Sequence, residues 1–142
     1  RLFVAATWQS LRFVEARVRR QGEFQSLPEG EVNQRVVTER EKFKSQTEFF
    51  FGIHANDPKF DDFDRPTSIW RLALVVGGRE YAPREVKRIG RASMDMRATY
   101  PYMDVFWVAY AVRFDAVLPP GQPAVLKVAS TLGQAQLSYQ AE

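Results

Sequence analysis

The sequence predicts an α+β protein in which an antiparallel β-sandwich is preceded by an N-terminal helical hairpin. From residue 47 onward, short segments rich in aromatic and β-branched residues follow one another, which is typical of the strands of an antiparallel sandwich. Two segments with apolar residues at helical spacing come before them. No helical segment separates the expected strands, so the helices are segregated at one end of the chain, as in α+β folds.

The segment from Pro101 to Phe114 is the most strand-like part of the chain. The large residues occupy every second position and are Phe106, Val108, Tyr110, Val112 and Phe114. A period of two with aromatic and β-branched residues predicts a strand with one face against a core. The opposite face is also largely apolar and carries Trp107, Ala109, Ala111 and Arg113. We therefore expect a central strand whose first face, Phe106 included, is largely buried.

Two helices are expected before residue 47. Apolar residues at helical spacing predict the first from Ser10 onward, and the chain is expected to turn between residues 21 and 27, where Gly22 weakens a helix. Residues 2–7 fit either a short strand or the first turns of a helix. The second helix is indicated by Ser26-Leu27-Pro28-Glu29, which fits a capping box with proline in the first turn.

Further strands are expected after the helices. The apolar run from Thr47 to Ala55 predicts a buried strand, and the Asp-rich segment after it predicts a loop. A second strand ends at Gly77-Gly78, which can form a tight hairpin turn. Its expected core face consists of Trp70, Leu72, Leu74 and Val76. A short edge strand is expected near residues 86–89, and two more strands follow the rigid loop Leu118–Pro123.

Composition narrows the classes of function. The 142 residues, 45% of them hydrophobic, suffice for one compact domain, which we expect to comprise a helical hairpin (1–46) packed on the sandwich (47–142). No apolar run approaches the roughly 18 to 20 residues of a membrane span. The absence of cysteine excludes disulfides, thiolate metal sites and cysteine nucleophiles. A net charge of +3 is too small to indicate a nucleic-acid partner without a clustered patch.

Three segments together resemble bacterial exported or lipoprotein-type domains that remain uncharacterised. They are FFFGIHAND, DDFDRPTSIWRLAL and TYPYMDVFWVAYAVRF, the last followed by a proline-glycine loop. The resemblance covers residues 47–140, and its markers are Trp70, Tyr100-Pro101 and the segment Tyr110 to Phe114. It implies a sandwich fold and a location in the bacterial cell envelope, periplasmic or lipid-anchored. It supplies no catalytic residues.

The start of the chain bears on the same expectation. The first residue is Arg1 and not methionine, so we expect a trimmed or processed chain. A signal peptide or a lipidated cysteine upstream would then lie outside this sequence. The expected partner is an unknown protein or another component of the envelope, and no cofactor is expected.

His54 and the acidic loop after it are the main candidates for catalysis or metal binding. His54 is the only histidine; it could be a general base oriented by an aspartate, although a strand-end position is the more frequent role. Oxygen ligands for calcium could come from Asp57, Asp61, Asp62 and Asp64. Their spacing does not match an EF-hand, and aspartates also shape turns. We expect no metal and no deep cleft joining His54 to two of these aspartates.

Other catalytic motifs have even less support in the sequence than His54 and the acidic loop. Glycoside hydrolysis needs two carboxylates at a defined distance in space, and a sequence does not give this distance. Residue type alone makes candidates of Asp61, Asp62, Asp64 and Asp104. None of the serines lies in a G-x-S-x-G elbow. There is no glycine loop of the phosphate-binding type, because Gly77-Gly78 lies in a hairpin context.

The segment from Arg79 to Arg97 is basic, with six cations against three acids. It could contact phosphates or anionic lipid headgroups, and the candidate residues are Arg84, Lys87, Arg88 and Arg91. Charges on a sheet edge more often prevent aggregation, and aromatic interleaving for single-stranded nucleic acid is nearly absent. A carbohydrate platform of Trp70, Trp107 and Tyr110 is a further alternative, but alternating strand positions favour the core.

These observations favour a non-enzymatic domain of the cell envelope that serves for binding or structural interaction. Two alternatives stay open. One is a hydrolase or metal-dependent enzyme that uses His54 and the aspartate loop. The other is a binder of anionic surfaces, lipid or nucleic acid, through residues 79–97.

Overall fold

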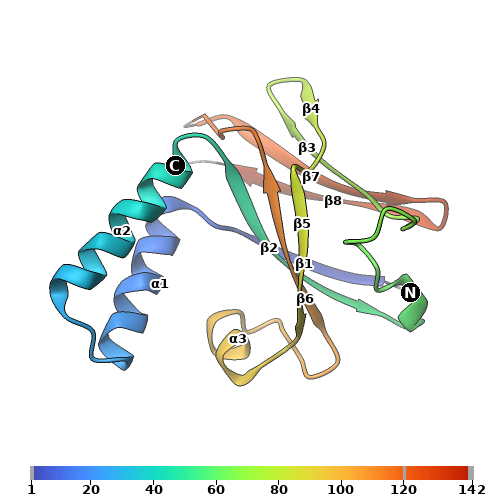
Figure 1. Ribbon diagram of the computed structural model, residues 1–142. Coiled ribbons are helices and arrows are strands. Elements are labelled where there is room, and N and C mark those ends of the chain that lie inside the picture. Colours follow the sequence, from blue (N-terminus) through green and yellow to red (C-terminus); the bar gives the residue numbers. More distant parts are fainter. Residues whose placement is uncertain (1, 120, 141–142) are drawn as a thin grey trace.

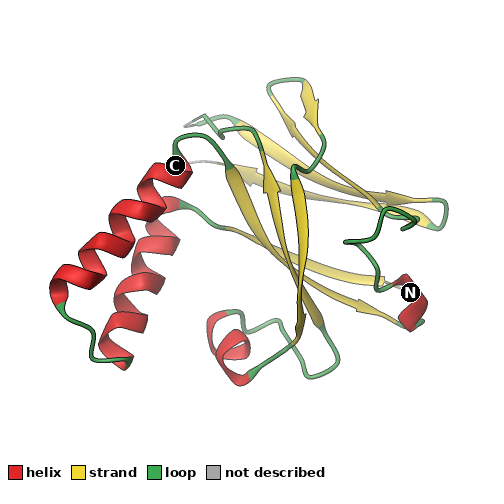
Figure 2. Cartoon of the chain, in the orientation of Figure 1, coloured by secondary structure: helices red, strands yellow, loops and turns green. Residues whose placement is uncertain are grey.

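Two four-stranded antiparallel sheets pack together beside a helical hairpin in the computed structural model, which describes residues 2–119 and 121–140 (Figures 1 and 2). The first sheet has the strand order β1 (Leu2–Trp8), β2 (Thr47–Ala55), β6 (Val108–Phe114) and β5 (Glu85–Arg91). The second has the order β4 (Arg79–Tyr81), β3 (Arg71–Val76), β7 (Pro123–Ser130) and β8 (Gly133–Gln140). The predicted class, an α+β protein built on an antiparallel sandwich, is confirmed.

The helical hairpin is inserted between the first two strands of the chain. It consists of α1 (Leu11–Phe24) and α2 (Glu29–Phe43). Residues 2–8 form β1, which pairs with β2 along its whole length, so the strand interpretation of the first residues is right. Four valines are buried between the two helices, namely Val14, Val18, Val32 and Val36. Among the described residues, no helix combines the length and apolar character needed to cross a bilayer.

The turn between the helices differs from the expected capping box. Ser26 has a φ of 52° and its side chain does not cap α2, whose N-cap is Pro28. The Leu27 amide donates to the Gly22 carbonyl at 2.9 Å, and the Ser26 amide donates to the Glu23 carbonyl at 3.2 Å. This pair of bonds is a Schellman motif, which ends α1 through a residue in the left-handed region. Ser26 therefore terminates the first helix and does not start the second.

The core lies between the inward faces of the two sheets. The buried strand predicted at Thr47–Ala55 is confirmed as β2, and the predicted core face of Trp70, Leu72, Leu74 and Val76 is buried as well. β6 lies between β2 and β5, as expected of a central strand. The side chains from both sheets that are least accessible to solvent are Tyr110, Phe49, Phe51, Phe114, Ile53, Leu74, Leu126, Val112 and Val128.

The inclusion of Phe106 in the core face was wrong, because its side chain is 73% exposed. The amide of Trp107 donates to the Asp104 carbonyl at 3.0 Å, so residues 104–107 form a turn and the strand alternation begins only at Val108. A short helix, α3 (Met94–Thr99), precedes this turn and was not expected either. The segment of α3 and the turn covers the outer face of β2 and β6, where Phe50 and Ala109 are buried.

The connections after β3 follow the sequence prediction in part. Gly77 and Gly78 have φ angles of 58° and 77°, as a tight hairpin turn requires. This turn produces β4, and the chain then crosses to the other sheet, where β5 is the expected edge strand. The predicted loop Leu118–Pro123 contains Pro120, which lies outside the described residues.

We predict that Val112→Asp unfolds the protein, since Val112 is fully buried in the centre of the sandwich. An unpaired carboxylate there costs at least about 4 kcal/mol, a large part of the stability of a typical domain. Chemical denaturation followed by circular dichroism measures this loss. The matched control is Val125→Asp on the solvent-facing side of β7, next to Lys127. Equal stability of the two variants would contradict the assignment of the faces.

Candidate functional site

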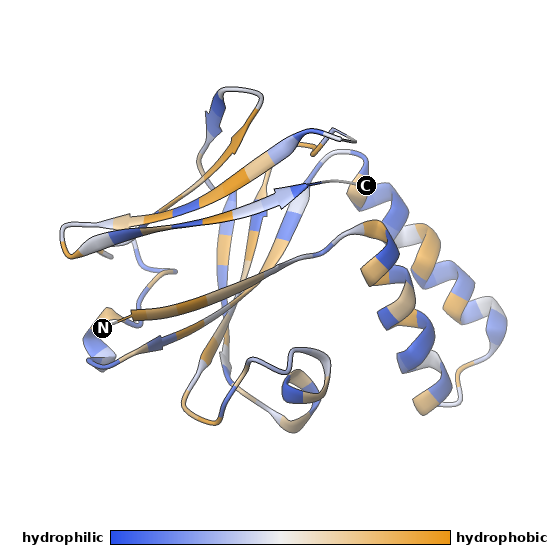
Figure 3. Cartoon of the chain, turned by 180° about the vertical axis from the view of Figure 1, so that it is seen from behind, coloured by the Kyte–Doolittle hydropathy of each residue, from blue (hydrophilic) through white to orange (hydrophobic). Residues whose placement is uncertain are grey.

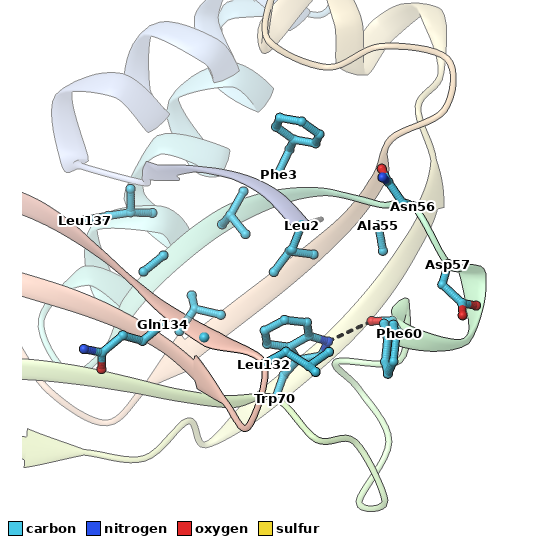
Figure 4. A pocket seen from close by; sticks show the side chains of 14 residues that line it. Leu2, Phe3, Ala55, Asn56, Asp57, Phe60, Trp70, Leu132, Gln134 and Leu137 are labelled. Atoms are coloured by element: carbon cyan, nitrogen blue, oxygen red, sulfur yellow. Dashed lines mark hydrogen bonds between the residues drawn. The ribbon is translucent and has the colours of Figure 1, made fainter.

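A large cavity lies between the two sheets, at the side where β1 and β8 form their free edges (Figure 4). Its volume is about 630 Å³. We call it the apolar opening, and its main lining residues are Leu2, Phe3, Val4, Ala55, Phe60, Trp70, Val128, Leu132, Ala135 and Leu137. It draws side chains from both sheets and from the loop after β2.

The opening exists because the two edge strands separate toward one end of the sandwich (Figure 3). At the other end Tyr139 of β8 closes the gap. Its hydroxyl donates to the Ala6 carbonyl of β1 at 2.6 Å, and its ring lies edge-on to Phe49 at 5.1 Å. From Leu2 to Val4 no such link reaches β8 among the described residues, so apolar side chains of both sheets face the cavity there.

Trp70 gives the opening a rigid wall. Its indole stacks on Phe63 with ring centroids 5.4 Å apart and planes 2° apart. Its N–H donates to the Phe60 carbonyl at 2.9 Å, as the dashed line in Figure 4 shows. Because its one polar atom is bonded, the ring can offer apolar surface to a ligand without leaving a donor unpaired.

The rim of the opening combines exposed apolar side chains with a few polar ones. Leu132 is 65% exposed, and Phe3, which is 48% exposed, points away from the cavity at its edge (Figure 4). Asn56, Asp57 and Gln134 contribute the polar groups. An apolar interior with a small number of polar groups at its edge is the usual composition of a ligand site.

A second, polar cavity of about 530 Å³ lies beside the loop after β2. It is lined by His54 together with Asp61, Asp62 and Asp64, and also by Arg88 and Arg91. No deep cleft joining His54 to two of the aspartates was expected, and this expectation was wrong in that His54 and three aspartates line one cavity. The loop folds back over the end of β5 and β6. This path brings its aspartates close to His54, whereas the sequence predicted an exposed loop.

Tyr110 holds this loop in place through Asp61. The Tyr110 hydroxyl donates to one Asp61 carboxylate oxygen, and the Arg88 guanidinium lies 3.2 Å from the other. Arg88 also donates to the Asp61 carbonyl at 3.0 Å. Burial raises the pKa of Tyr110 well above its usual value, and the bond to Asp61 raises this pKa further. Asp61 is thus an anchor between the loop and the sandwich.

The other acidic candidates are engaged in local structure. The Asp57 carboxylate caps a short 3-10 helix (Pro58–Phe60), and its bonds to the Lys59 amide and ammonium lower the pKa of Asp57. Asp62 accepts from the Ser68 hydroxyl at 3.0 Å. Asp104 binds the Val105 amide in the turn before β6 and does not line the polar cavity. The four carboxylates named for glycoside chemistry are therefore not brought to one site.

His54 lies on the outward face of β2 and stacks on Phe3 of β1, with ring centroids 6.1 Å apart. Among the described residues no aspartate is hydrogen-bonded to it. No group of three or more His, Asp or Glu side chains in the described part of the chain is arranged to hold a metal ion. The cavity thus contains the residue types of the expected catalytic pair without their hydrogen bond.

The four candidate anion contacts do not form one patch. Arg84 pairs with Asp115 at 2.8 Å and Arg88 with Asp61. Lys87 and Arg88 are neighbours on β5 and point to opposite faces of the sheet, as strand geometry requires. Arg91 lines the polar cavity, beyond an irregularity in strand pairing between Arg88 and Gly90.

The apolar opening has no clear signature in the sequence. Trp70 and Leu137 were placed in strands, but nothing in their alternation tells a filled sandwich edge from an open one. One signal was available: the segments 2–8 and 133–140 contain no charged residue. Edge strands usually carry charges, and a pair of uncharged edges indicates a surface that contacts something else.

Comparison with known proteins gave no relative: no protein-family model, curated protein or solved structure matches this chain.

We predict that a metal chelator leaves the melting temperature unchanged. The oxygens of Asp57, Asp61 and Asp62 already accept hydrogen bonds from protein groups, whereas a bound calcium ion would stabilise the native state by mass action. Differential scanning fluorimetry with and without EDTA measures the shift. A drop that added calcium reverses, and that Asp62→Ala lacks, would contradict this expectation.

We predict that alkaline pH destabilises the closed end of the sandwich through Tyr139. Burial raises the pKa of Tyr139 to about 12, from about 10 in an unfolded chain. The folded state therefore holds this proton more tightly, and the resulting stabilisation is complete below about pH 10 and is lost as the pH rises to about 12. Urea denaturation at several pH values should give a shallower alkaline loss for Tyr139→Phe. Tyr81→Phe on the short β4 is the control, and equal slopes for all three proteins would be the contrary result.

Proposed function

We propose that this protein is a non-enzymatic binding domain of the bacterial cell envelope and that the apolar opening is its ligand site. The observation that carries the proposal is the cavity of about 630 Å³ between the edges of β1 and β8. This volume lies within the roughly 300–1,000 Å³ of typical ligand sites. A sandwich that served only as a scaffold would gain stability by filling such a space.

The chemistry of the lining selects an apolar ligand. Leu2, Val4 and Leu137 contribute aliphatic surface, and Trp70 contributes the largest aromatic one. Each Å² of apolar surface removed from water contributes about 25 cal/mol, so a ligand that covers these side chains gains affinity without needing a charge. The polar group of Asn56 at the rim can orient it.

The envelope location rests on the resemblance of residues 47–140 to exported and lipoprotein-type domains. An apolar site that is accessible from outside suits that setting, because envelope domains bind other envelope proteins and apolar envelope components. The partner is accordingly proposed to be a protein or another envelope component.

A second candidate function is a hydrolase or metal-dependent enzyme. It is favoured by one observation, the polar cavity that joins His54 to Asp61, Asp62 and Asp64. It ranks second because Asp61 and Asp62 are bound by Tyr110, Arg88 and Ser68, and because His54 has no aspartate partner in the described chain. The response to EDTA and calcium tests the metal-dependent form of this candidate.

We predict that the neutral apolar dye N-phenyl-1-naphthylamine binds in the opening and that Ala135→Phe weakens this binding at least about tenfold. Ala135 lines the cavity, so an added ring occupies the space of the ligand. Dye fluorescence titrated against protein measures the affinity. The matched control is Gln136→Phe, the same change on the neighbouring residue of β8, which does not line the cavity.

The control should bind the dye within about twofold of the original protein, since its new side chain points to solvent. Melting curves of both variants show whether they are folded. Failure of the original protein to bind the dye, or equal binding by the two variants, would reject the opening as the ligand site.

A further inference from the structure

The free edge strands on the two sides of the sandwich differ in length and in charge. On one side, β5 carries Glu85, Lys87, Arg88 and Arg91 and has a pairing irregularity, and β4 is only three residues long. Charges, bulges and short strands are the usual means by which proteins prevent a free edge from pairing. On the other side, β1 and β8 are seven and eight residues long and contain neither a charge nor an internal proline. The edges of β4 and β5 are thus protected against pairing with a further strand, whereas the edges of β1 and β8 can accept one.

Of the two unprotected edges, β8 is the more accessible. It pairs with β7 along its whole length and has no strand on its other side. On β1, by contrast, the Ala6 carbonyl accepts from Tyr139 and the Thr7 carbonyl accepts from the Gln9 side chain at 3.4 Å. From Gln134 to Tyr139 the described hydrogen bonds of the β8 main chain are those to β7 alone. The groups that point away from β7 form a row that another extended main chain can complete.

The side chains of β8 match such an arrangement. Ala135 and Leu137 face the apolar opening, and Gln134, Gln136 and Ser138 are exposed. A strand added next to β8 would alternate in the same way, since successive side chains point to opposite faces. Its inward side chains, about 7 Å apart, would enter the opening beside Leu137 of β8 and Leu2 of β1. One bound segment could therefore satisfy both the free main chain and the apolar cavity.

A second copy of this chain would not meet both requirements. The inward residues of its own β8, which are Ala135, Leu137 and Tyr139, already pack against its own core. Its outward residues are glutamines and a serine. Pairing of two β8 strands would satisfy the main chain but would bring no apolar side chain into the opening, so a segment from another protein fits better.

We propose that β8 accepts an extended, uncharged segment of a partner protein as an additional strand, with apolar residues at every second position filling the apolar opening. This inference rests on the proposed function, because it takes the opening to be the binding site, and it adds the chemistry of the partner. Main-chain hydrogen bonds to β8 would provide the affinity, and the cavity would select the alternating apolar residues.

The test uses the folded protein and a fluorescein-labelled peptide with four valines alternating with threonines and a lysine at each end for solubility. Fluorescence anisotropy measures binding, and hydrogen exchange followed by NMR measures the protection of the amides of β8. We expect saturable binding that displaces N-phenyl-1-naphthylamine and slows exchange in β8 at least about tenfold. A peptide N-methylated at two adjacent central residues keeps its side chains, and because successive amides of a strand point to opposite edges, one methyl group faces β8 whichever way the peptide lies. It should bind at least about tenfold more weakly, since one donor toward β8 is lost and the methyl group prevents close pairing.

Matched variants of the protein complete the test. Leu137→Lys places a charge on the inward face of the edge, a natural means of preventing strand addition, and should abolish peptide binding. Gln136→Lys places the same charge on the outward face and should bind within about twofold of the original protein. The N-methylated peptide is tested on the unaltered protein, so the inference stays testable even if Leu137→Lys does not fold.

The outcomes separate the two proposals. Dye binding without peptide binding, or equal affinity for the methylated and unmethylated peptides, overturns strand addition and leaves the opening as an apolar ligand site. Self-association in sedimentation experiments with protected β8 amides also overturns it, because a second copy would then occupy the edge. Absence of both dye and peptide binding rejects the proposed function itself.

Discussion

The pairing of β2 with β6 is the interaction on which the rest of the structure depends. These two strands are adjacent over seven residue pairs and are covered on both faces. Their inward side chains, such as Phe51 and Tyr110, form the centre of the core. On the outward face the Phe50 ring stacks on Tyr100 with centroids 3.6 Å apart. This pair lies at the centre of its sheet, so β1 and β5 pair with it on either side and the second sheet packs across the core from it.

The apolar opening follows from that arrangement. The fully buried side chains of the core come from β2, β6, β3 and β7. The inward side chains of the outer strands β1 and β8 are only partly buried. β1 and β8 are joined at Tyr139 and Ala6 and separate from there toward Leu2 and Gly133. The same twist that lets two sheets pack closely at their centre makes their corners diverge. The opening is thus a consequence of sandwich geometry combined with small or aliphatic side chains at one corner.

The polar cavity shows why acidic residues close together in sequence are a weak guide to chemistry. The loop after β2 has to cross from one sheet to the other, and its main chain needs partners near the sandwich. Asp57 and Asp62 supply local bonds, and Asp61 binds the buried Tyr110 hydroxyl and Arg88. Carboxylates used in this way support the loop and leave less capacity for a metal or a substrate. This division of roles favours binding at the apolar opening over catalysis in the polar cavity.

The sequence by itself determined the elements that local physics controls. Alternation of apolar residues identified β3 and β6 as strands with a buried face, and a continuous apolar run identified β2. Helical spacing identified α1 and α2, and Gly77-Gly78 identified the hairpin turn. The antiparallel sandwich followed from the number and spacing of the strands. Where local signals competed, the sequence was misleading: Ser26 fits a capping box, yet it ends α1, and Phe106 continues a strand pattern that a turn interrupts.

Only the tertiary structure decided where a site could form. The lining of the opening comes from β1, β8 and the loop after β2, segments that are up to 135 residues apart in the chain, as Leu2 and Leu137 are. Whether two sheet edges meet or diverge depends on strand order, twist and the filling of the core between them, and none of these is a property of a local segment. Likewise, the hydrogen bond of Asp61 with Tyr110 depends on the path of a loop across the sandwich. Periodicity tells which face of a strand is buried, but the fold as a whole determines which buried surface stays open to a ligand.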